Sequence, residues 1–301
     1  NPAVFEPPVY AELTQIYDPD TLYTHPGWNQ HCAQLAVGQV VRVVAKDGNA
    51  LLIDQPIRLR YEERLHLQIR PIGVVESVGI EDLHIKRLDD GEGGIIQIKN
   101  AALVWILGVE SEMASRFHVN AEVVYRCEIR DSYFHHAHGY GGGGNGYGVE
   151  FSRHTTNCLV ENNIFSTLRH SMMVHIGANG NVFGYNYSRD ATAVSNWYTP
   201  DISVHGHFPF ANLFEGNVVQ EIGLGDYWGP AGPDNTIFRN CIQNEGIEIL
   251  DHSHGQILIG NAPIDGARNQ IYIDPTVQNT TVHGNYVNGA TQWDPGNPDH
   301  D

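Results

Sequence analysis

The sequence predicts an all-β fold, a right-handed parallel β-helix (a solenoid) with an additional β element at its N-terminus. Two observations lead to this prediction. A short phrase repeats through the second half of the chain at a nearly constant spacing, and apolar runs are short throughout, with 32 glycines among 301 residues. Long amphipathic patterns typical of helices are missing, and only residues 111–117 suggest a single helical turn.

Each copy of the phrase has a polar residue, a short β-prone run, and Asn or Asp five positions later. Successive copies begin 31, 24, 31, 23, 21 and 24 residues apart, a spacing typical of a solenoid in which insertions enlarge individual turns. Parallel strands of neighbouring turns would pair about 4.8 Å apart, and connections between parallel strands are right-handed. The copies are RCEIRD (126–131), NCLVEN (157–162), NVFGYN (181–186), NLFEGN (212–217), NTIFRN (235–240), QILIGN (256–261) and TTVHGN (280–285).

The phrase predicts two columns of stacked side chains. The apolar third position belongs to the core, in Leu159, Phe183, Phe214, Ile237, Leu258 and Val282. The last position predicts a ladder of side chains that bond from turn to turn at one bend: Asp131, Asn162, Asn186, Asn217, Asn240, Asn261 and Asn285. The same alignment places Cys127 beside Cys158, and favours two free thiols because parallel side chains hold the Cβ atoms too far apart for a disulfide.

The predicted solenoid spans residues 70–290, with looser copies of the phrase at 79–88 and 101–111. Residues 1–69 are predicted to form the N-terminal β element, because two β-rich runs flank the turn sequence Asp47-Gly48-Asn49. We expect this element to pack against the first turn, since a solenoid must protect its exposed strand edge. Residues 291–301 are predicted to be a C-terminal tail.

Amino-acid composition limits the classes of molecule that the protein could bind. Charged residues make up 17% of the chain and the net charge is -18, which argues against nucleic acid and against an anionic membrane surface. No apolar run approaches the length of a membrane span, so we expect no membrane insertion. A signal peptide is not visible at Asn1, which is compatible with a mature secreted form. The four cysteines have no CxxC spacing, which argues against a zinc knuckle.

Several segments resemble pectate-lyase-like, right-handed parallel β-helix proteins, in particular a bacterial secreted subgroup. They are GIEDLHI (79–85), the repeated phrases, LRHSMMVHIGANGNVFGYNYS (168–188) and HGHFPFANLFEGN (205–217). The resemblance covers roughly residues 70–290. It implies a carbohydrate-active protein that acts on a polysaccharide outside the cell or at its surface. This fold hosts lyases, hydrolases, epimerases and adhesins, so the resemblance is specific for fold rather than activity.

The family's two best-known mechanisms do not transfer to this chain. An Asp-rich calcium cluster followed by Arg-x-Pro-x-x-Arg, expected of calcium-dependent pectate lyases, is missing. The Asn-Thr-Asp, Asp-Asp and Gly-His-Gly motifs of polygalacturonases are missing as well. Any active site must therefore be predicted from the residues themselves.

The stretch HHAHGYGGGGNGYGVEFSRH (135–154) combines four consecutive glycines with clustered histidines. A phosphate-binding loop would need a preceding strand, a following helix and a lysine, yet no lysine occurs between residues 100 and 301. The glycines also fall in a spacing of 31 residues between copies, whereas the next spacing is 24. We therefore predict an inter-turn loop at 139–148.

Titratable residues lie at comparable points before successive phrases and predict a polar stripe that lines a groove, with the 139–148 loop as one wall. An arginine can bind a uronate carboxylate bidentately while a histidine removes the proton from the adjacent carbon, as β-elimination requires. Candidate catalytic residues are His175, Arg169, His170, Arg153 and His154, and His175 is the expected base. Candidates for substrate binding are His205, His207, Asp226 and His252.

Three clusters have metal-like spacing, at 135–138, 205–207 and 251–254. A transition metal at His135 with His138, or at His205 with His207, is one prediction. Calcium is the alternative, since it takes oxygen ligands such as those of Asp226, Asp234 and Glu215.

Three functional hypotheses follow. The first is a lyase that cleaves an acidic, uronate-containing polysaccharide. The second is a non-enzymatic adhesin or structural unit of an extracellular assembly, which self-associates through stackable ends. The third is a polysaccharide hydrolase that uses Asp226 and Asp251 as its two carboxylates.

Overall fold

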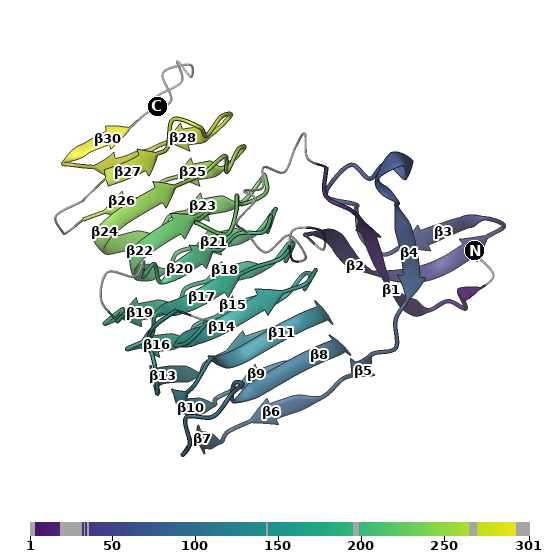
Figure 1. Cartoon of the computed structure of the whole chain (residues 1–301), viewed down its shortest axis with the longest axis horizontal. Helices are drawn as coiled ribbons and strands as arrows, with labels where there is room; N and C mark the ends of the chain where they lie inside the picture. The colour runs from purple at the N-terminus through teal and green to yellow at the C-terminus, as the bar shows by residue number, and fades with distance from the viewer. Residues whose placement is uncertain are drawn as a thin grey trace.

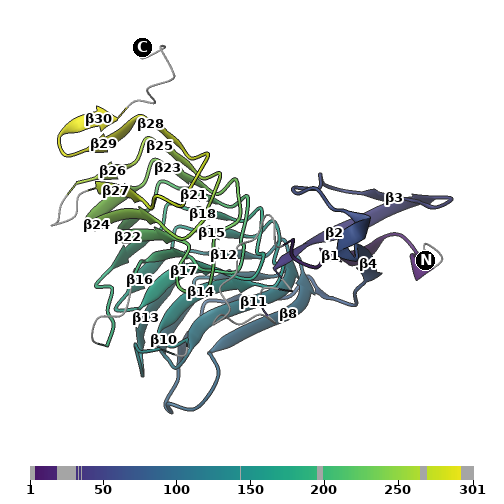
Figure 2. The same cartoon turned by 45° about the horizontal axis from the view of Figure 1, so that its top comes forward.

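The computed structural model describes residues 4–18, 32, 34, 36–142, 144–194, 199–264 and 270–292. They form a right-handed parallel β-helix of about 8 turns, with a separate antiparallel sheet on its flank (Figure 1). Each complete turn contributes one strand to each of three faces, and the strands of neighbouring turns pair in parallel (Figure 2). The predicted fold is confirmed.

The first face is a nine-stranded parallel sheet built from the repeated phrase. Its strands are three residues long, because the chain bends sharply at both ends of the phrase. They are β6 (Gly79–Glu81), β9 (Trp105–Leu107), β12 (Glu128–Arg130), β15 (Leu159–Glu161), β18 (Val182–Gly184), β21 (Leu213–Glu215), β23 (Thr236–Phe238), β25 (Ile257–Ile259) and β28 (Thr281–His283).

The second and third faces join into one sheet, because β22 (Val218–Leu224) and β24 (Cys241–Ile249) run across the bend between them. The second face also contains β7 (His84–Lys86), β10 (Glu110–Ala114), β13 (Tyr133–Ala137), β16 (Ile164–Ser166), β19 (Tyr187–Arg189) and β26 (Ala262–Pro263). The third contains β5 (Val75–Glu76), β8 (Ile96–Ala102), β11 (Phe117–Tyr125), β14 (Tyr147–Ser152), β17 (His170–Val174), β20 (Ile202–Val204) and β27 (Gln270–Ile273). A hairpin of β29 (Asn285–Val287) and β30 (Ala290–Gln292) follows the last turn.

The core is a column of inward-facing apolar side chains. Phe183 and Phe214 stack with their ring centroids 5.1 Å apart, and both are fully buried. In the preceding turn the inward residue is Val160, whereas the sequence predicted Leu159, so this copy of the phrase was aligned one position too early.

The same shift corrects the predicted ladder. The register pairs Leu159 with Val182, so Asn163 stacks on Asn186 and Asn162 does not. Asn162 is exposed, and its side chain donates to Asp131 Oδ1 (2.6 Å) beside the ladder. Two adjacent asparagines made the position ambiguous in the sequence. The ladder consists of Asn163, Asn186, Asn217, Asn240, Asn261 and Asn285.

Each ladder amide satisfies backbone groups at the bend. The Nδ2 atom of Asn217 donates to the carbonyl of Phe183 (2.9 Å) and to Asn240 Oδ1 (3.0 Å). Its Oδ1 accepts from the backbone N–H of Asn186 (3.0 Å). A second ladder, which the sequence did not predict, follows the first position of the phrase through Asn181, Asn212, Asn235 and Gln256. The signal for it was the polar residue that opens each copy.

The predicted neighbours Cys127 and Cys158 are stacked on adjacent turns at the start of this second ladder. The backbone N–H of Cys127 lies 3.1 Å from Cys158 Sγ, and both side chains are buried free thiols. The helical turn predicted at residues 111–117 is wrong. Strand β10 occupies its first part, because it pairs in parallel with β7 on one side and β13 on the other.

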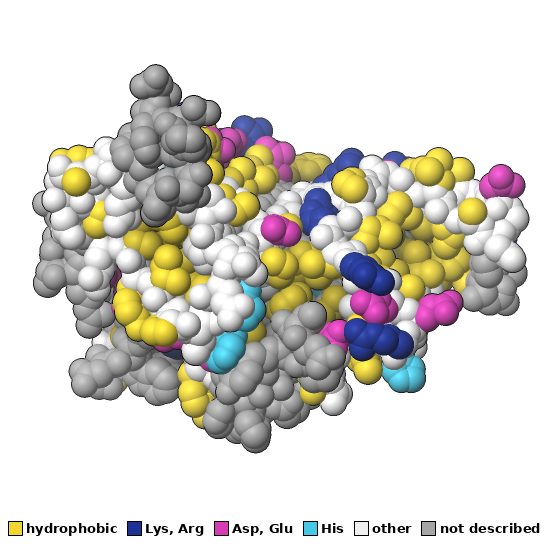
Figure 3. All heavy atoms as spheres, turned by 90° about the horizontal axis from the view of Figure 1, so that it is seen from above, with side chains coloured by type: hydrophobic (Ala, Val, Ile, Leu, Met, Phe, Trp, Pro, Cys, Tyr) yellow, Lys and Arg dark blue, Asp and Glu magenta, His cyan; other side chains and the backbone are white. Residues whose placement is uncertain are grey.

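The N-terminal sheet has the strand order β3-β2-β1-β4. Seen from above, it protrudes from the solenoid, and basic and acidic side chains lie together on the protrusion (Figure 3). Its elements are β1 (Val9–Gln15), β2 (Val37–Asp47), β3 (Ala50–Ile53), β4 (Gln68–Pro71) and a short 3-10 helix (Glu63–Leu65). The hairpin predicted around Gly48 is present between β2 and β3.

The sheet lies along the side of the solenoid instead of packing only on its first turn. It contacts the first turn through Tyr10 Oη, which donates to Glu76 Oε1 (2.6 Å). Further along, the backbone N–H of Val40 donates to Thr156 Oγ1 (3.2 Å), and Asn179 Nδ2 donates to the carbonyl of Gly38 (3.0 Å). Polar groups at the bends of several turns therefore hold the sheet. Within the described ranges, no helix is long and apolar enough to cross a membrane.

Candidate functional site

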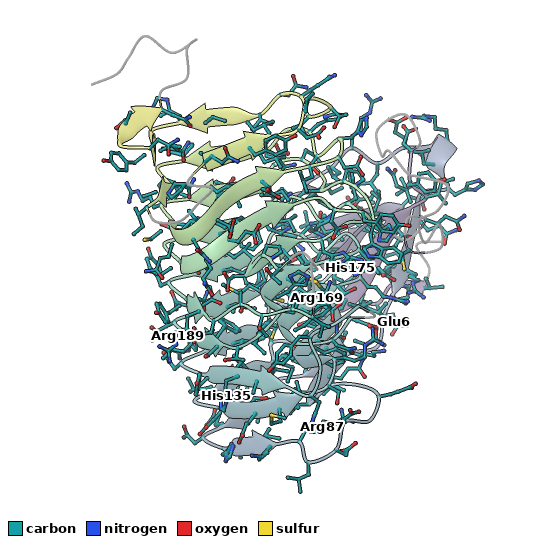
Figure 4. All side chains as sticks on the ribbon, turned by 60° about the vertical axis from the view of Figure 1, so that its left-hand side comes forward. Glu6, Arg87, His135, Arg169, His175 and Arg189 are labelled. Carbon is teal, nitrogen blue, oxygen red and sulfur yellow. The ribbon has the colours of Figure 1, made fainter. Side chains whose placement is uncertain are left out.

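A pocket of about 320 Å³ opens on the third face, along β14 and β17 and beside the end of β20. Figure 4 labels two of its residues, Arg169 and His175, which lie near the middle of the solenoid, whereas His135 lies nearer its N-terminal end. The pocket is lined by Cys32, Arg116, Gly142, Gly144, Tyr147, Glu150, Arg169, Met173, His175, His205, His207 and Trp228.

The strand register explains why these side chains meet. Alternation along β14 points Val149 and Phe151 into the core and leaves Glu150 on the outer surface. Beyond the strand ends, the backbone N–H of His175 bonds to the carbonyl of Phe151 (2.8 Å), and the N–H of His205 to that of Val174 (3.0 Å). Residues at the same point of successive turns are thereby stacked beside Glu150.

Three histidines form a contact cluster at one side of the pocket. The Nε2 atom of His175 lies 3.2 Å from Nδ1 of His207, and the rings of His175 and His205 are 4.7 Å apart. Asp226 Oδ2 lies 3.3 Å from Nδ1 of His205. The Nε2 atom of His207 is buried without a hydrogen-bond partner among the described residues. It is a polar atom that a bound ligand could satisfy.

Burial disfavours the charged forms of His175 and His207. Desolvation, followed by the charges of His205, His207 and Arg153, holds the pKa of His175 well below its usual value. Burial and the neighbouring His205 lower the pKa of His207 to about 4. An imidazole that is unprotonated at neutral pH can accept a proton from a substrate.

Glu150 is the acidic member of the pocket. Burial raises its pKa to about 7, against opposing effects of a hydrogen bond with Asn120 and the charge of Arg116. The side chain is 14% exposed, and its Oε1 atom lies 3.9 Å from His175 Nδ1. At neutral pH the protonated and ionised forms of this carboxyl are both populated, which suits proton transfer.

Two arginines lie on alternate turns with a glycine between them. Pairing of Phe117 with Tyr147 and of Tyr147 with His170 places Arg116, Gly146 and Arg169 at one point of three successive turns. Gly146 has a φ of +77°, and a Cβ atom there would lie 3.4 Å from Arg169 Cβ. The same Cβ atom would lie 2.9 Å from the carbonyl oxygen of Gly139, so only glycine fits between the two arginine positions.

The glycine loop forms a wall of the pocket through Gly142 and Gly144. Nη1 of Arg169 donates to the carbonyl of Gly141 (2.9 Å), which ties the loop to the site. Gly144 has a φ of +82°, and a Cβ atom there would lie 2.8 Å from Arg116 Nη2. The loop is glycine-rich because its backbone runs against the arginines.

The structure places the remaining predicted catalytic residues away from the pocket lining. His170 is buried behind it, with Nδ1 2.9 Å from the carbonyl of Pro200 and its ring 5.2 Å from that of Tyr147. Arg153 and His154, both at positive φ, turn the chain toward the N-terminal sheet. There His154 Nδ1 lies 2.8 Å from Glu12 Oε1 in a different cavity.

The remaining binding and metal candidates are dispersed. His252 lies against Asp251 (3.1 Å) and does not line the pocket. His135 contacts Glu110 (3.2 Å), and Nε2 of His138 lies 3.3 Å from the carbonyl of Arg87. Among the residues that the structure describes, no group of three or more His, Cys, Asp or Glu has a geometry that could hold a metal ion.

Sequence reasoning missed Arg116, Tyr147, Glu150, Met173 and Trp228. For Glu150 a signal existed, because a lone acidic residue between Val149 and Phe151 must face outward on a strand. For Arg116 the only signal was its alignment with Arg169, two turns on.

No known family model matches the sequence, and no curated protein matches it significantly.

Proposed function

We propose that the protein is a secreted, carbohydrate-active member of the pectate-lyase-like β-helix group, which cleaves a uronate-containing polysaccharide by β-elimination in this pocket. One observation carries the proposal. Two arginines line one pocket with a histidine whose pKa burial holds well below its usual value and a carboxyl group whose pKa burial raises to about 7.

Arg116 and Arg169 would bind the uronate carboxylate. A guanidinium group forms paired hydrogen bonds with a carboxylate, which stabilise the negative charge that develops when the adjacent carbon loses its proton. The chain has a net charge of -18, which opposes a polyanion at long range. The pocket itself has two guanidinium groups and one carboxyl of raised pKa, so its local potential favours an acidic sugar.

His175 is the proposed base and Glu150 the proposed acid. His175 takes the proton from C5 of the uronate, and the electrons of that C–H bond form a double bond between C4 and C5. The bond between C4 and the glycosidic oxygen then breaks, and the protonated Glu150 gives its proton to the leaving oxygen. The products are an unsaturated uronate and a new chain end, and no redox partner is needed.

The two carboxylates that motivated the hydrolase hypothesis do not lie together in the pocket. Asp226 and Asp251 occupy successive turns, but Asp251 lies against His252 and is not part of the pocket lining. The adhesin hypothesis requires a binding surface without turnover, which the same experiment can distinguish.

The test is an assay of polygalacturonate, alginate, glucuronan and hyaluronan, each with and without calcium, for the absorbance of unsaturated products near 235 nm. We expect at least one polymer to be cleaved. Binding of a polymer without a change in absorbance would favour the adhesin hypothesis over the lyase. The absence of both binding and cleavage would overturn the proposal.

A further inference from the structure

A tight turn at the rim of the pocket presents two aromatic side chains to solvent. The backbone N–H of Asp226 donates to the carbonyl of Gly229 (3.1 Å), and the N–H of Gly229 donates back to Asp226 (3.0 Å). Oδ1 of Asp226 also accepts from the N–H groups of Trp228 (2.8 Å) and Gly206 (3.3 Å). Residues 226–229 are thus fixed to the strand end that carries the histidines.

Gly206 allows this close approach. A Cβ atom at Gly206 would lie 2.5 Å from the backbone nitrogen of Gly229, so the two backbone segments touch directly. Asp226 meanwhile places its second carboxylate oxygen 3.3 Å from His205. The turn and the histidine cluster therefore form one rigid unit.

Folding does not bury the two aromatic rings on this turn. Tyr227 is 67% exposed and Trp228 40% exposed, and their planes stand at 81° with centroids 5.4 Å apart. Large rings held rigidly in water at the edge of a cavity are typical of binding surfaces. Trp228 lines the same pocket as His175 and His207.

We infer that Tyr227 and Trp228 form a subsite that binds a second sugar of the polymer by stacking, next to the sugar held at His175. This inference rests on the proposed function. A pyranose ring has an apolar face of C–H groups, which can cover an indole while its hydroxyl groups stay in water. The only ionisable groups of the turn are Asp226, engaged by backbone N–H groups and His205, and the Tyr227 hydroxyl. The subsite therefore selects a ring face and chain length, and accepts neutral and acidic sugars alike.

The experiment measures the affinity of the single sugar and of the six-sugar oligosaccharide, prepared from the four polymers above, in the His175→Ala background to prevent cleavage. We expect Trp228→Ala to weaken binding of the hexasaccharide about tenfold and to change binding of the single sugar by less than about twofold. Trp228→Phe should recover part of the loss, since an aromatic face remains. The matched control is Tyr185→Ala, which removes a ring that is 60% exposed but does not line the pocket.

The outcomes separate the subsite from the chemistry. Unchanged hexasaccharide affinity in Trp228→Ala would overturn the subsite and leave the proposed lyase intact. Equal losses for the single sugar and the hexasaccharide would also overturn it, because Trp228 would then contact the reacting sugar. A loss confined to the hexasaccharide, in a protein that gives no unsaturated product, would support the subsite while the lyase chemistry fails.

Discussion

His175 and His207 meet through ring nitrogens 3.2 Å apart, although 32 residues separate them in the chain. The two positions lie on neighbouring turns of the solenoid. Because two imidazolium ions at this distance would repel each other, the contact requires at least one neutral ring. When His175 Nε2–H donates to His207 Nδ1, Nδ1 of His175 is left unprotonated on the side of Glu150.

We expect His175→Ala to lower the elimination rate to about 1% of wild type or less, because it removes the proposed base. The side chain lines the pocket and is not part of the apolar core, so the melting temperature should stay within a few degrees. The measurement is initial rate near 235 nm together with thermal unfolding. His252→Ala, which changes a histidine outside the pocket, should retain full activity; equal losses in both variants would contradict the assignment.

The pH dependence of the elimination rate should follow the ionisation of Glu150. Its pKa is raised from the ordinary 4.5 to about 7, and the proposed acid must be protonated to work. Activity should therefore be high at weakly acidic pH and fall about tenfold per pH unit above roughly pH 7. The rate should not fall as the pH is lowered through 6.5, the ordinary imidazole value, because the pKa of His175 lies well below it. Glu150→Gln should lower kcat about 100-fold or more, whereas an alkaline optimum would exclude this role.

The ladder predicts a contrast between two adjacent asparagines. Asn163→Ala should destabilise the fold by about 2 kcal/mol or more, since it leaves the buried backbone groups of Ser132 and Ile129 without partners. Asn162→Ala removes an exposed side chain and should cost no more than about 0.5 kcal/mol. Denaturant unfolding of both variants measures the difference. Similar values would mean that the register of this turn is wrong.

Attachment of the N-terminal sheet should weaken in acid. Burial alone would raise the pKa of Glu12, but bonds and charges from His154 and Arg70 outweigh it and lower the pKa to about 2. Because the folded-state pKa lies below the ordinary 4.5, the stabilisation is complete above about pH 4.5 and is lost as the pH falls toward 2. Glu12→Gln should cost about 2 kcal/mol at pH 7 and nothing further at pH 2.

The measurement is the free energy of unfolding of the wild type and of Glu12→Gln at pH 7 and pH 2. The control is Glu62→Gln, which changes a carboxylate at the surface. Glu62 is 30% exposed and pairs with Arg64, which is 55% exposed, so its replacement should have little effect at either pH. A loss at pH 7 that is equally large for Glu62→Gln would show that the buried pair has no special role.

The sequence by itself determined the solenoid and the ladder at Asn186, Asn217 and Asn240. It did so because turns that stack in register must repeat the same apolar and amide positions, whatever the lengths of their loops. It also located His175, His205 and His207 on one stripe, since residues at the same point of successive turns are neighbours. These features depend on periodicity, which a sequence records directly.

Only the tertiary structure decided which polar residues share the pocket. The choice between Asn162 and Asn163, and the direction in which Arg153 and His154 leave the stripe, depend on where each bend places its positive φ angles. Whether Glu150 and Arg116 line the same pocket as His175 depends on the strand register between turns of unequal length. Loop lengths absorb the differences between turns, so no spacing in the sequence specifies that register; backbone pairing across the stack does.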